Sequence, residues 1–193
     1  MSRPVEYDRE FVLARATQSF WKKGFHATSM SDLVDATGLK PGSLYGGFHS
    51  KEALFLDSID YYGNRSVAAI GDILNNADAP LEGIRVFITR IGKELTSHDK
   101  GHACFLVNSS LELSSSNPLV KQRVKHHFDA IETLFRKALS EAKKAGDLSK
   151  DKDPKSLAAF LMTSIWGLRV MGETDPKPDR VDAVVKSVLS VLA

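Results

Sequence analysis

The sequence predicts an all-α protein with a small amino-terminal unit of three helices and a larger carboxy-terminal helical unit. Apolar residues recur at helical spacing along most of the chain, and Pro and Gly residues mark helix starts and stops. The chain has 193 residues, 42% of them hydrophobic, which is enough to bury a core. We place the two predicted domains at residues 1–52 and 53–193.

The first helix is predicted over residues 8–23. Asp8 can cap its amino terminus, and Gly24 supplies the stop at its other end. Leu13, Ala16 and Phe20 repeat at helical spacing between them. This helix is therefore expected to brace the segment that follows it.

Residues 28–51 predict two short helices joined by a tight glycine turn. Thr28 or Ser29 can cap the first helix, and Gly38 follows it where a left-handed stop is cheapest. Pro41 takes the first position of the second helix, where a missing N–H costs nothing. Isolated helices shorter than about 12 residues are marginal in water, so the surrounding chain must hold this pair. The pattern predicts a helix-turn-helix.

This stretch resembles the amino-terminal signature of the TetR (tetracycline-repressor-like) family of transcriptional regulators. The resemblance covers residues from Val12 to about Phe55, and it implies an all-helical homodimer. Such a dimer binds double-stranded operator DNA through a three-helix helix-turn-helix DNA-binding domain and loses affinity when a small-molecule effector enters its carboxy-terminal ligand-binding and dimerisation domain. The residues that agree in type and spacing are Phe25, Thr28, Ser29, Met30, Asp32, Leu33, Gly38, Leu39, Gly42, Ser43, Leu44, Tyr45, Phe48, Ser50, Lys51, Glu52, Ala53, Leu54 and Phe55.

The resemblance also implies which residues contact DNA. Backbone phosphates are expected at Tyr45, His49 and Lys51, whereas the start of the second short helix faces the bases. Residues there are small, so direct readout is expected from Ser31, Ser43 and Lys40, with readout of DNA shape beside it. The whole predicted DNA-binding set is Thr28, Ser29, Ser31, Lys40, Pro41, Gly42, Ser43, Tyr45, His49 and Lys51.

Two positions depart from the family pattern, and the charge of this domain is balanced. Lys40 stands where a Ser or Thr usually caps the recognition helix, and Gly47 stands where a His or Tyr often touches phosphate. Residues 1–65 hold eight Lys and Arg against eight Asp and Glu, in a chain of net charge +2. A local basic rim of Lys22, Lys23, Lys40, His49 and Lys51 is therefore expected to provide the attraction to DNA.

The remainder of the chain is helical by its pattern. Ser50 is expected to cap a long helix that bridges the two domains, with a phosphate at its amino terminus. Residues 103–113 also fit a strand, but their helical neighbours favour a buried helix. The other predicted helices are residues 81–95, 117–145, 154–172 and 178–192.

The last two predicted helices carry more apolar surface than one core needs. The final helix has a wide stripe that includes Val185 and Val188, and Phe160 and Trp166 lie on different faces of the helix before it. A helix that is apolar on two sides must be covered twice. A second copy of the chain is the economical cover, so we expect a homodimer with a four-helix interface.

Aromatic and polar residues of the carboxy-terminal domain are candidates for a ligand cavity. Cys104, Asn108 and Glu112 recur at every fourth position, so they form one polar stripe that faces either a polar cavity or another polar element. A TetR subgroup carries a similar segment and some of its members sense electrophiles; simple packing is the alternative role for Cys104. The predicted ligand-binding residues are Tyr61, Phe87, Cys104, Phe105, Asn108, Phe128, Met162 and Trp166, with Tyr62 a further aromatic candidate and a plain core the alternative.

Several classes of function are disfavoured. One cysteine excludes an intrachain disulfide, and no stretch approaches the ~20 apolar residues of a membrane helix, so we expect a cytoplasmic protein without a membrane partner. His98, His102, His126 and His127 show no metal spacing with that cysteine, so we expect no metal and no cofactor and place them at the surface or in a pocket.

Two other functional classes are alternatives to a DNA-binding regulator. An enzyme would use Cys104 as a nucleophile with His102 as base, but no oxyanion motif, phosphate loop or carboxylate pair accompanies them, so we expect no catalytic residue. A helical adaptor that binds protein is the third class, and DNA binding by the amino-terminal domain would distinguish it.

Overall fold

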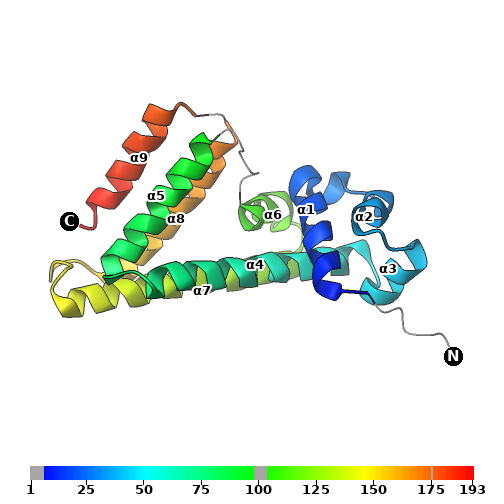
Figure 1. Ribbon diagram of the computed structural model, residues 1–193, viewed down its shortest axis with the longest axis horizontal. Coiled ribbons are helices and arrows are strands. Elements are labelled where there is room, and N and C mark those ends of the chain that lie inside the picture. Colours follow the sequence, from blue (N-terminus) through cyan, green and yellow to red (C-terminus); the bar gives the residue numbers. More distant parts are fainter. Residues whose placement is uncertain (1–6, 98–103, 175) are drawn as a thin grey trace.

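The computed structural model describes residues 7–97, 104–174 and 176–193, and within these ranges it is entirely helical (Figure 1). The all-α prediction is confirmed. The predicted strand alternative for residues 103–113 is wrong where it can be checked, since Phe105–Leu113 is a helix. The helices are α1 (Arg9–Ala27), α2 (Met30–Thr37), α3 (Pro41–Phe48), α4 (Lys51–Asn75), α5 (Pro80–Thr96), α6 (Phe105–Leu113), α7 (Pro118–Ala145), α8 (Pro154–Gly172) and α9 (Pro178–Ser190).

The long helices α4 and α7 run side by side and form a bar through the molecule (Figure 1). Helices α1, α2 and α3 lie at one end of the bar, and α5, α8 and α9 stand at an angle to its other end. Helix α6 packs on α1, α4 and α7. Because α4 begins beside α3 and continues along α7, the bar connects the two ends of the molecule.

Local signals in the sequence explain most helix ends. The side chains of Asp8, Asn117 and Asp153 accept hydrogen bonds from first-turn amides of α1, α7 and α8. Gly146 adopts the left-handed conformation at the end of α7. Gly24 has φ +80° and bends α1 three residues before its end, so the predicted stop at Gly24 appears as a kink.

Two clusters of buried apolar side chains form the core, and they do not divide at residue 52. One cluster joins α5, α7, α8 and α9 with the second half of α4. The other, which we call the amino-terminal cluster, joins α1 to α4 but also takes in α6 and the start of α7. It comprises Val12, Ala16, Phe20, Leu33, Leu44, Phe48, Leu54, Phe55, Leu56, Ile59, Phe105, Leu106, Leu113, Val120 and Val124.

A polar link fixes the bar at its centre. Asp60 on α4 pairs with Arg123 on α7 and accepts a hydrogen bond from His127, whose Nε2 lies 3.0 Å from the carboxylate. Burial, and then the neighbouring His126 and Arg123, lower the pKa of His127. The His127 ring occupies the space beside Gly63, where an added Cβ would lie only 2.3 Å from Cγ of the ring. His127 is 2% exposed, so its predicted place at the surface or in a pocket is wrong.

Candidate nucleic-acid interface and interior cavity

Helix α2 is held by bonds at both of its ends. The Ser29 hydroxyl accepts from the Asp32 amide at 3.1 Å, and the Asp32 carboxylate accepts from the Ser29 amide at 2.8 Å. Lys23 on α1 donates to the same carboxylate at 2.7 Å, and with Ser29 it holds the pKa of Asp32 well below its usual range. Gly38 ends the helix in the left-handed conformation. These bonds tie α2 to α1, so the two helices present one surface.

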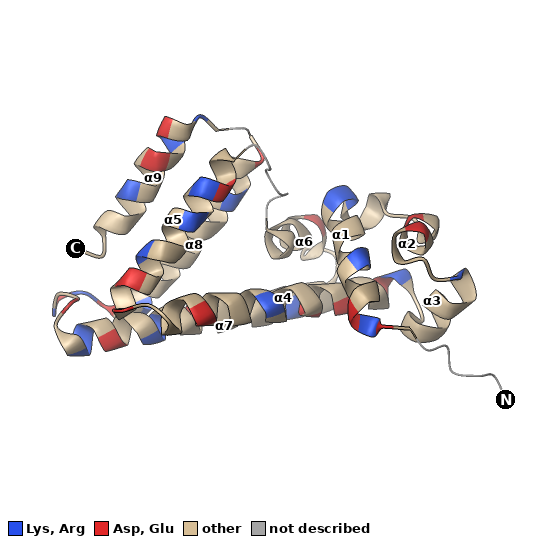
Figure 2. Ribbon diagram, viewed as in Figure 1, with Lys and Arg blue, Asp and Glu red and all other residues tan. Residues whose placement is uncertain are grey.

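Helix α3 buries one edge and exposes the other. Leu44 and Phe48 are buried in the amino-terminal cluster, whereas Tyr45 keeps 47% of its surface exposed. Pro41 and Gly42 are exposed, and no charged residue lies in the helix itself. Figure 2 shows this uncharged helix at the end of the molecule, with charged residues before and after it. A surface of small residues beside one aromatic hydroxyl allows close approach to the edge of a DNA groove.

Some of the predictions for the α2–α3 and α3–α4 junctions are confirmed. Lys40 makes no side-chain cap to α3, which agrees with the predicted departure from a Ser or Thr cap. His49 closes α3 with φ +64°, a conformation that costs free energy for a residue with a Cβ. The Ser50 hydroxyl accepts from the Ala53 amide at 3.0 Å and starts α4, as predicted.

Two predicted DNA-binding residues have roles inside the protein. Thr28 is 0% exposed and its hydroxyl donates to the Gly24 carbonyl at 2.6 Å, so the predicted contact of this side chain with DNA is wrong. Lys51 donates to the carbonyls of Phe25 and Thr28, at 2.9 Å each, and its nitrogen lies 4.3 Å from the centroid of the Phe25 ring. A phosphate contact by Lys51 stays a prediction, but the ammonium already joins α4 to the α1–α2 junction.

Helix α6 also binds the α1–α2 junction. The carboxylate of Glu112 accepts from the backbone amides of Phe25 at 3.0 Å and His26 at 2.9 Å. These amides follow the kink at Gly24, where the α1 backbone leaves two donors without helical partners. Glu112 and Lys51 together thus bind the amides and carbonyls of residues 25–28, which orient α2.

Glu112→Ala is expected to lower the free energy of unfolding by about 1.5–3 kcal/mol, because two backbone amides lose a charged acceptor. Urea unfolding at pH 7 measures the difference. Glu141→Ala, an exposed substitution on α7, is the control and should change stability by less than about 0.5 kcal/mol. Equal stability of the two variants would show that Glu112 does not hold the junction.

An interior cavity of about 370 Å³ lies between α4, α5, α6, α7 and α8. Five of the predicted ligand-binding residues line it: Phe87, Cys104, Phe128, Met162 and Trp166. Tyr61, Phe105 and Asn108 are not among its lining residues, whereas Tyr62, the further aromatic candidate, is one of them. Phe105 is instead buried in the amino-terminal cluster.

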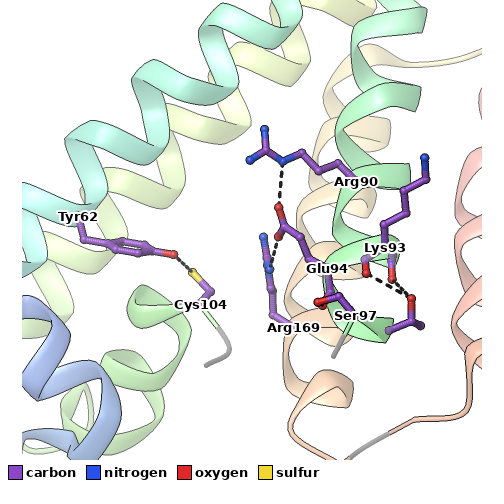
Figure 3. Close-up of polar contacts among 9 residues, drawn as sticks. Tyr62, Arg90, Lys93, Glu94, Ser97, Cys104 and Arg169 are labelled. Atoms are coloured by element: carbon purple, nitrogen blue, oxygen red, sulfur yellow. Dashed lines mark hydrogen bonds and ion pairs between the residues drawn. The ribbon is translucent and has the colours of Figure 1, made fainter. Parts of the chain in front are cut away.

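The cavity has polar groups at two places, which Figure 3 shows on different helices. Tyr62 on α4 donates to the sulfur of Cys104 at 3.8 Å, and burial, then the neighbouring thiol, raises the pKa of this phenol. Glu94 on α5 accepts from Arg90 at 2.9 Å and from Arg169 of α8 at 3.0 Å. The space between these groups is walled by apolar and aromatic side chains.

The predicted polar stripe of α6 divides between two places. Cys104 precedes the helix and lines the cavity, whereas Glu112 lies one helix length away at the α1–α2 junction. One short helix therefore connects the cavity with the helix-turn-helix. His98 and His102, two of the residues weighed as ligands or bases, lie outside the described residues.

The apolar stripe of α9 faces its own domain. Val185 is 8% exposed and Val188 is 5% exposed, and both belong to the core formed with α5, α7 and α8. The inference that these two valines are surplus surface is wrong. Outward-facing residues of α8 supply an alternative surface: Phe160 and Val170 are 44% and 45% exposed, and Thr163 and Gly167 lie between them on the same face.

The described residues contain no group of three His, Cys, Asp or Glu side chains placed to hold a metal ion. Within the same ranges, no helix has the length and apolar character needed to cross a bilayer.

A helix-turn-helix that exposes α3, joined by α4 and α6 to a cavity among the helices that follow it, defines a class of DNA-binding regulator with a pocket. Comparison with known proteins agrees with this class. Residues 12–57 match the family described as bacterial regulatory proteins, tetR family, and residues 80–188 match the tetracyclin repressor-like C-terminal domain. The chain belongs to the TetR family of transcriptional regulators, and it is not an enzyme.

The similarity to known proteins extends over most or all of the chain. It is 30% identical over 193 residues to the uncharacterized HTH-type transcriptional regulator YezE of Bacillus subtilis, with 100% of both chains covered. The HTH-type transcriptional repressor ComR of Escherichia coli is 31% identical over 169 residues, which are 87% of this chain and 80% of ComR. A structure of the TetR family regulator CifR with 26-base-pair operator DNA superposes with a TM-score of 0.85 at 29% identity, covering 97% of this chain and 98% of CifR.

Proposed function

We propose that this regulator is a ligand-responsive repressor, which binds a pseudo-palindromic operator as a homodimer and is released by a small-molecule effector. The observation that carries the proposal is the connection of one cavity to the helix-turn-helix through α6, with Cys104 at one end and Glu112 at the other. The protein would act in the cytoplasm, where double-stranded operator DNA lies.

The proposed DNA interface is the exposed edge of α2 and α3 with the start of α4. Base contacts would come from Ser31, Lys40 and Ser43, and phosphate contacts from Tyr45 and His49. Exposure of Tyr45 and the small size of the first residues of α3 support this assignment. The solved complex of CifR with operator DNA, a similar chain, supports DNA as the partner.

Dimerisation would place two copies of α3 against two half-sites. A two-fold axis across the outward face of α8 would cover Phe160, Gly167 and Val170. Half-sites read from the major groove by such a dimer lie about 10 base pairs, or a multiple, apart.

Effector binding would act through α4 and α6. A molecule in the cavity contacts Tyr62 of α4 and Cys104 before α6, and these two helices end or begin at the residues that hold the α1–α2 junction. Displacement of either helix would turn α2 and α3 away from a geometry that fits both half-sites, and affinity for DNA would fall.

Ser43→Ala is expected to weaken binding to the operator by about tenfold, because loss of a base contact costs roughly 1–3 kcal/mol. Affinity for random DNA should change little. A gel-shift titration with the promoter region of the protein's own gene and with a scrambled fragment of equal length makes the comparison. Ser140→Ala, on α7, is the matched control.

Two outcomes would contradict this proposal. Equal weakening on both fragments would assign Ser43 to positioning rather than to reading of bases. Absence of any specific shift by the native protein, together with capture of a protein partner, would favour the adaptor class. A thermal-shift screen of small molecules then tests the effector, because a ligand that binds only the folded state raises stability by RT ln(1 + [L]/Kd).

A further inference from the structure

The cavity carries an excess of positive charge at one end. Its charged lining residues are Arg90, Glu94 and Arg169, which sum to a formal charge of +1 over the described residues. The carboxylate of Glu94 is shared between the two guanidinium groups, with N···O distances of 2.9 and 3.0 Å. One carboxylate cannot neutralise two guanidinium groups, so among the residues that the structure describes this end retains one unmatched positive charge.

Arg169 is the better placed of the two cations. Its side chain is 21% exposed, whereas that of Arg90 is 64% exposed and lies at the rim. Only Nη1 of Arg169 bonds to Glu94, and its other N–H groups have no partner among the described residues. A guanidinium presents five donors in a planar fork that matches a carboxylate, so Arg169 keeps an edge for a second anion.

The rest of the lining matches a flat apolar body. Phe128 and Trp166 lie with ring centroids 4.8 Å apart, and Phe87, Met162 and Ile165 extend the same apolar wall. Figure 3 shows the Tyr62 and Cys104 pair across the cavity from Arg169 and Glu94. A volume of about 370 Å³ is within the range of roughly 300–1,000 Å³ for small-molecule pockets and accommodates one or two fused or linked aromatic rings.

We propose that the cavity binds aromatic monocarboxylates, with the carboxylate on the free edge of Arg169 and the rings against Phe128 and Trp166. This inference rests on the proposed function, because it names the chemical class of the effector. A single negative charge pairs with the unmatched positive charge, whereas a neutral ligand leaves it without a counter-charge. Aromatic rings gain contact with the facing aromatic walls.

The test compares three carboxylates with their primary amides, which have nearly the same shape and no charge. The pairs are benzoate and benzamide, 2-naphthoate and 2-naphthamide, and biphenyl-4-carboxylate and its amide. Binding to the full-length protein is measured without DNA by titration calorimetry at pH 7. At least one carboxylate should bind to the native protein tenfold or more tightly than its amide. The proposal is overturned if every amide binds as tightly as its carboxylate, or if none of the six compounds binds.

Variants locate the anion. Arg169→Gln should remove the preference for the carboxylate and leave the affinity of the amide within about twofold, and Arg169→Lys should restore part of the preference. Arg136→Gln, an exposed substitution on α7, is the control and should bind as the native protein does. If Arg169→Gln does not fold, Arg90→Gln provides the second measurement and should reduce the preference, because it lowers the same positive charge. A folded Arg169→Gln protein that keeps the full preference for the carboxylate would overturn the assignment of the anion to Arg169. If Arg169→Gln does not fold, an undiminished preference in Arg90→Gln would overturn it.

The proposed function and the proposed ligand class can each fail without the other. A protein that prefers carboxylates but shows no specific DNA shift would refute the repressor and keep the ligand class. A protein that binds operator DNA and releases it with a neutral molecule would keep the repressor and refute the carboxylate.

Discussion

Phe160→Glu is expected to convert the proposed homodimer to a folded monomer that has lost specific affinity for its operator. The phenyl ring is 44% exposed on α8 and adds little to its own core, so a charge at this position should not unfold the chain. Across a two-fold interface, however, two such carboxylates would meet. Linked half-site contacts strengthen binding by about 100-fold to 10,000-fold, so the monomer should lose at least about 100-fold on the operator.

Light scattering after size-exclusion chromatography measures the mass, and a gel-shift titration measures the affinity. Leu119→Glu places the same charge on another exposed apolar position, 52% exposed on α7, and should leave the mass unchanged. Val185→Glu is the contrasting variant and should unfold, because this side chain is buried. A Phe160→Glu monomer with full operator affinity would remove the need for a dimer, and a stable dimer would place the interface elsewhere.

Gly63→Ala is expected to destabilise the protein by about 2–3 kcal/mol, a typical cost of overpacking a rigid site. Its Cβ would lie 2.3–2.5 Å from three atoms of the His127 ring, and that ring is held by its bond to Asp60. Gly71→Ala lies on the same helix, and its Cβ would meet only Leu134, at 3.9 Å. That control should instead stabilise the helix by up to about 1 kcal/mol, as Ala does relative to Gly.

A double-mutant cycle isolates the cause. In the His127→Ala background the ring is absent, so Gly63→Ala should cost nothing or stabilise the protein. Urea unfolding of the four proteins gives the coupling free energy. If Gly63→Ala lowered stability equally in both backgrounds, the close approach of α4 and α7 at this position would not be the reason for glycine.

Helix ends could be predicted because their signals are local. Gly38, Pro41, Ser50, Asn117 and Gly146 each act on the backbone within a few residues of themselves, so neighbouring sequence suffices. The helix-turn-helix followed from these signals and from the spacing of apolar residues. Its exposed edge could likewise be predicted, because Leu44 and Phe48 define which side of α3 is buried.

The cavity could be predicted only in part, because rotation of a helix about its axis depends on distant residues. Helix α4 carries Tyr61 and Tyr62 side by side, and it is Tyr62 that lines the cavity, where it contacts Cys104 and Phe105. The fate of Val185 depends on Gly92 of α5, where an added Cβ would lie 2.9 Å from Val185 Cγ2. The spacing of apolar residues along α9 cannot show that a glycine on α5 leaves room for Val185.

The buried polar contacts could not be predicted from the sequence either. Lys51 looks like a phosphate ligand because basic residues near a helix-turn-helix often are, but its nitrogen finds two carbonyls of the α1–α2 junction. Glu112 belongs to the predicted polar stripe, but Cys104 of the same stripe faces a different part of the molecule. Both contacts join residues more than 20 positions apart, so only the fold reveals them.

The make-up of the amino-terminal cluster limits how this regulator can be recombined with its relatives. Phe105, Leu106, Val120 and Val124 come from α6 and α7, yet they complete the core beneath the DNA-reading helices. A hybrid joined at the end of α4 would seat a foreign α6 and α7 on that core, and an isolated fragment of α1–α4 would leave it open to water. A working graft must therefore carry these four side chains, Leu113, which is the fifth member of the cluster from α6 and α7, and Glu112 as part of the DNA-binding unit.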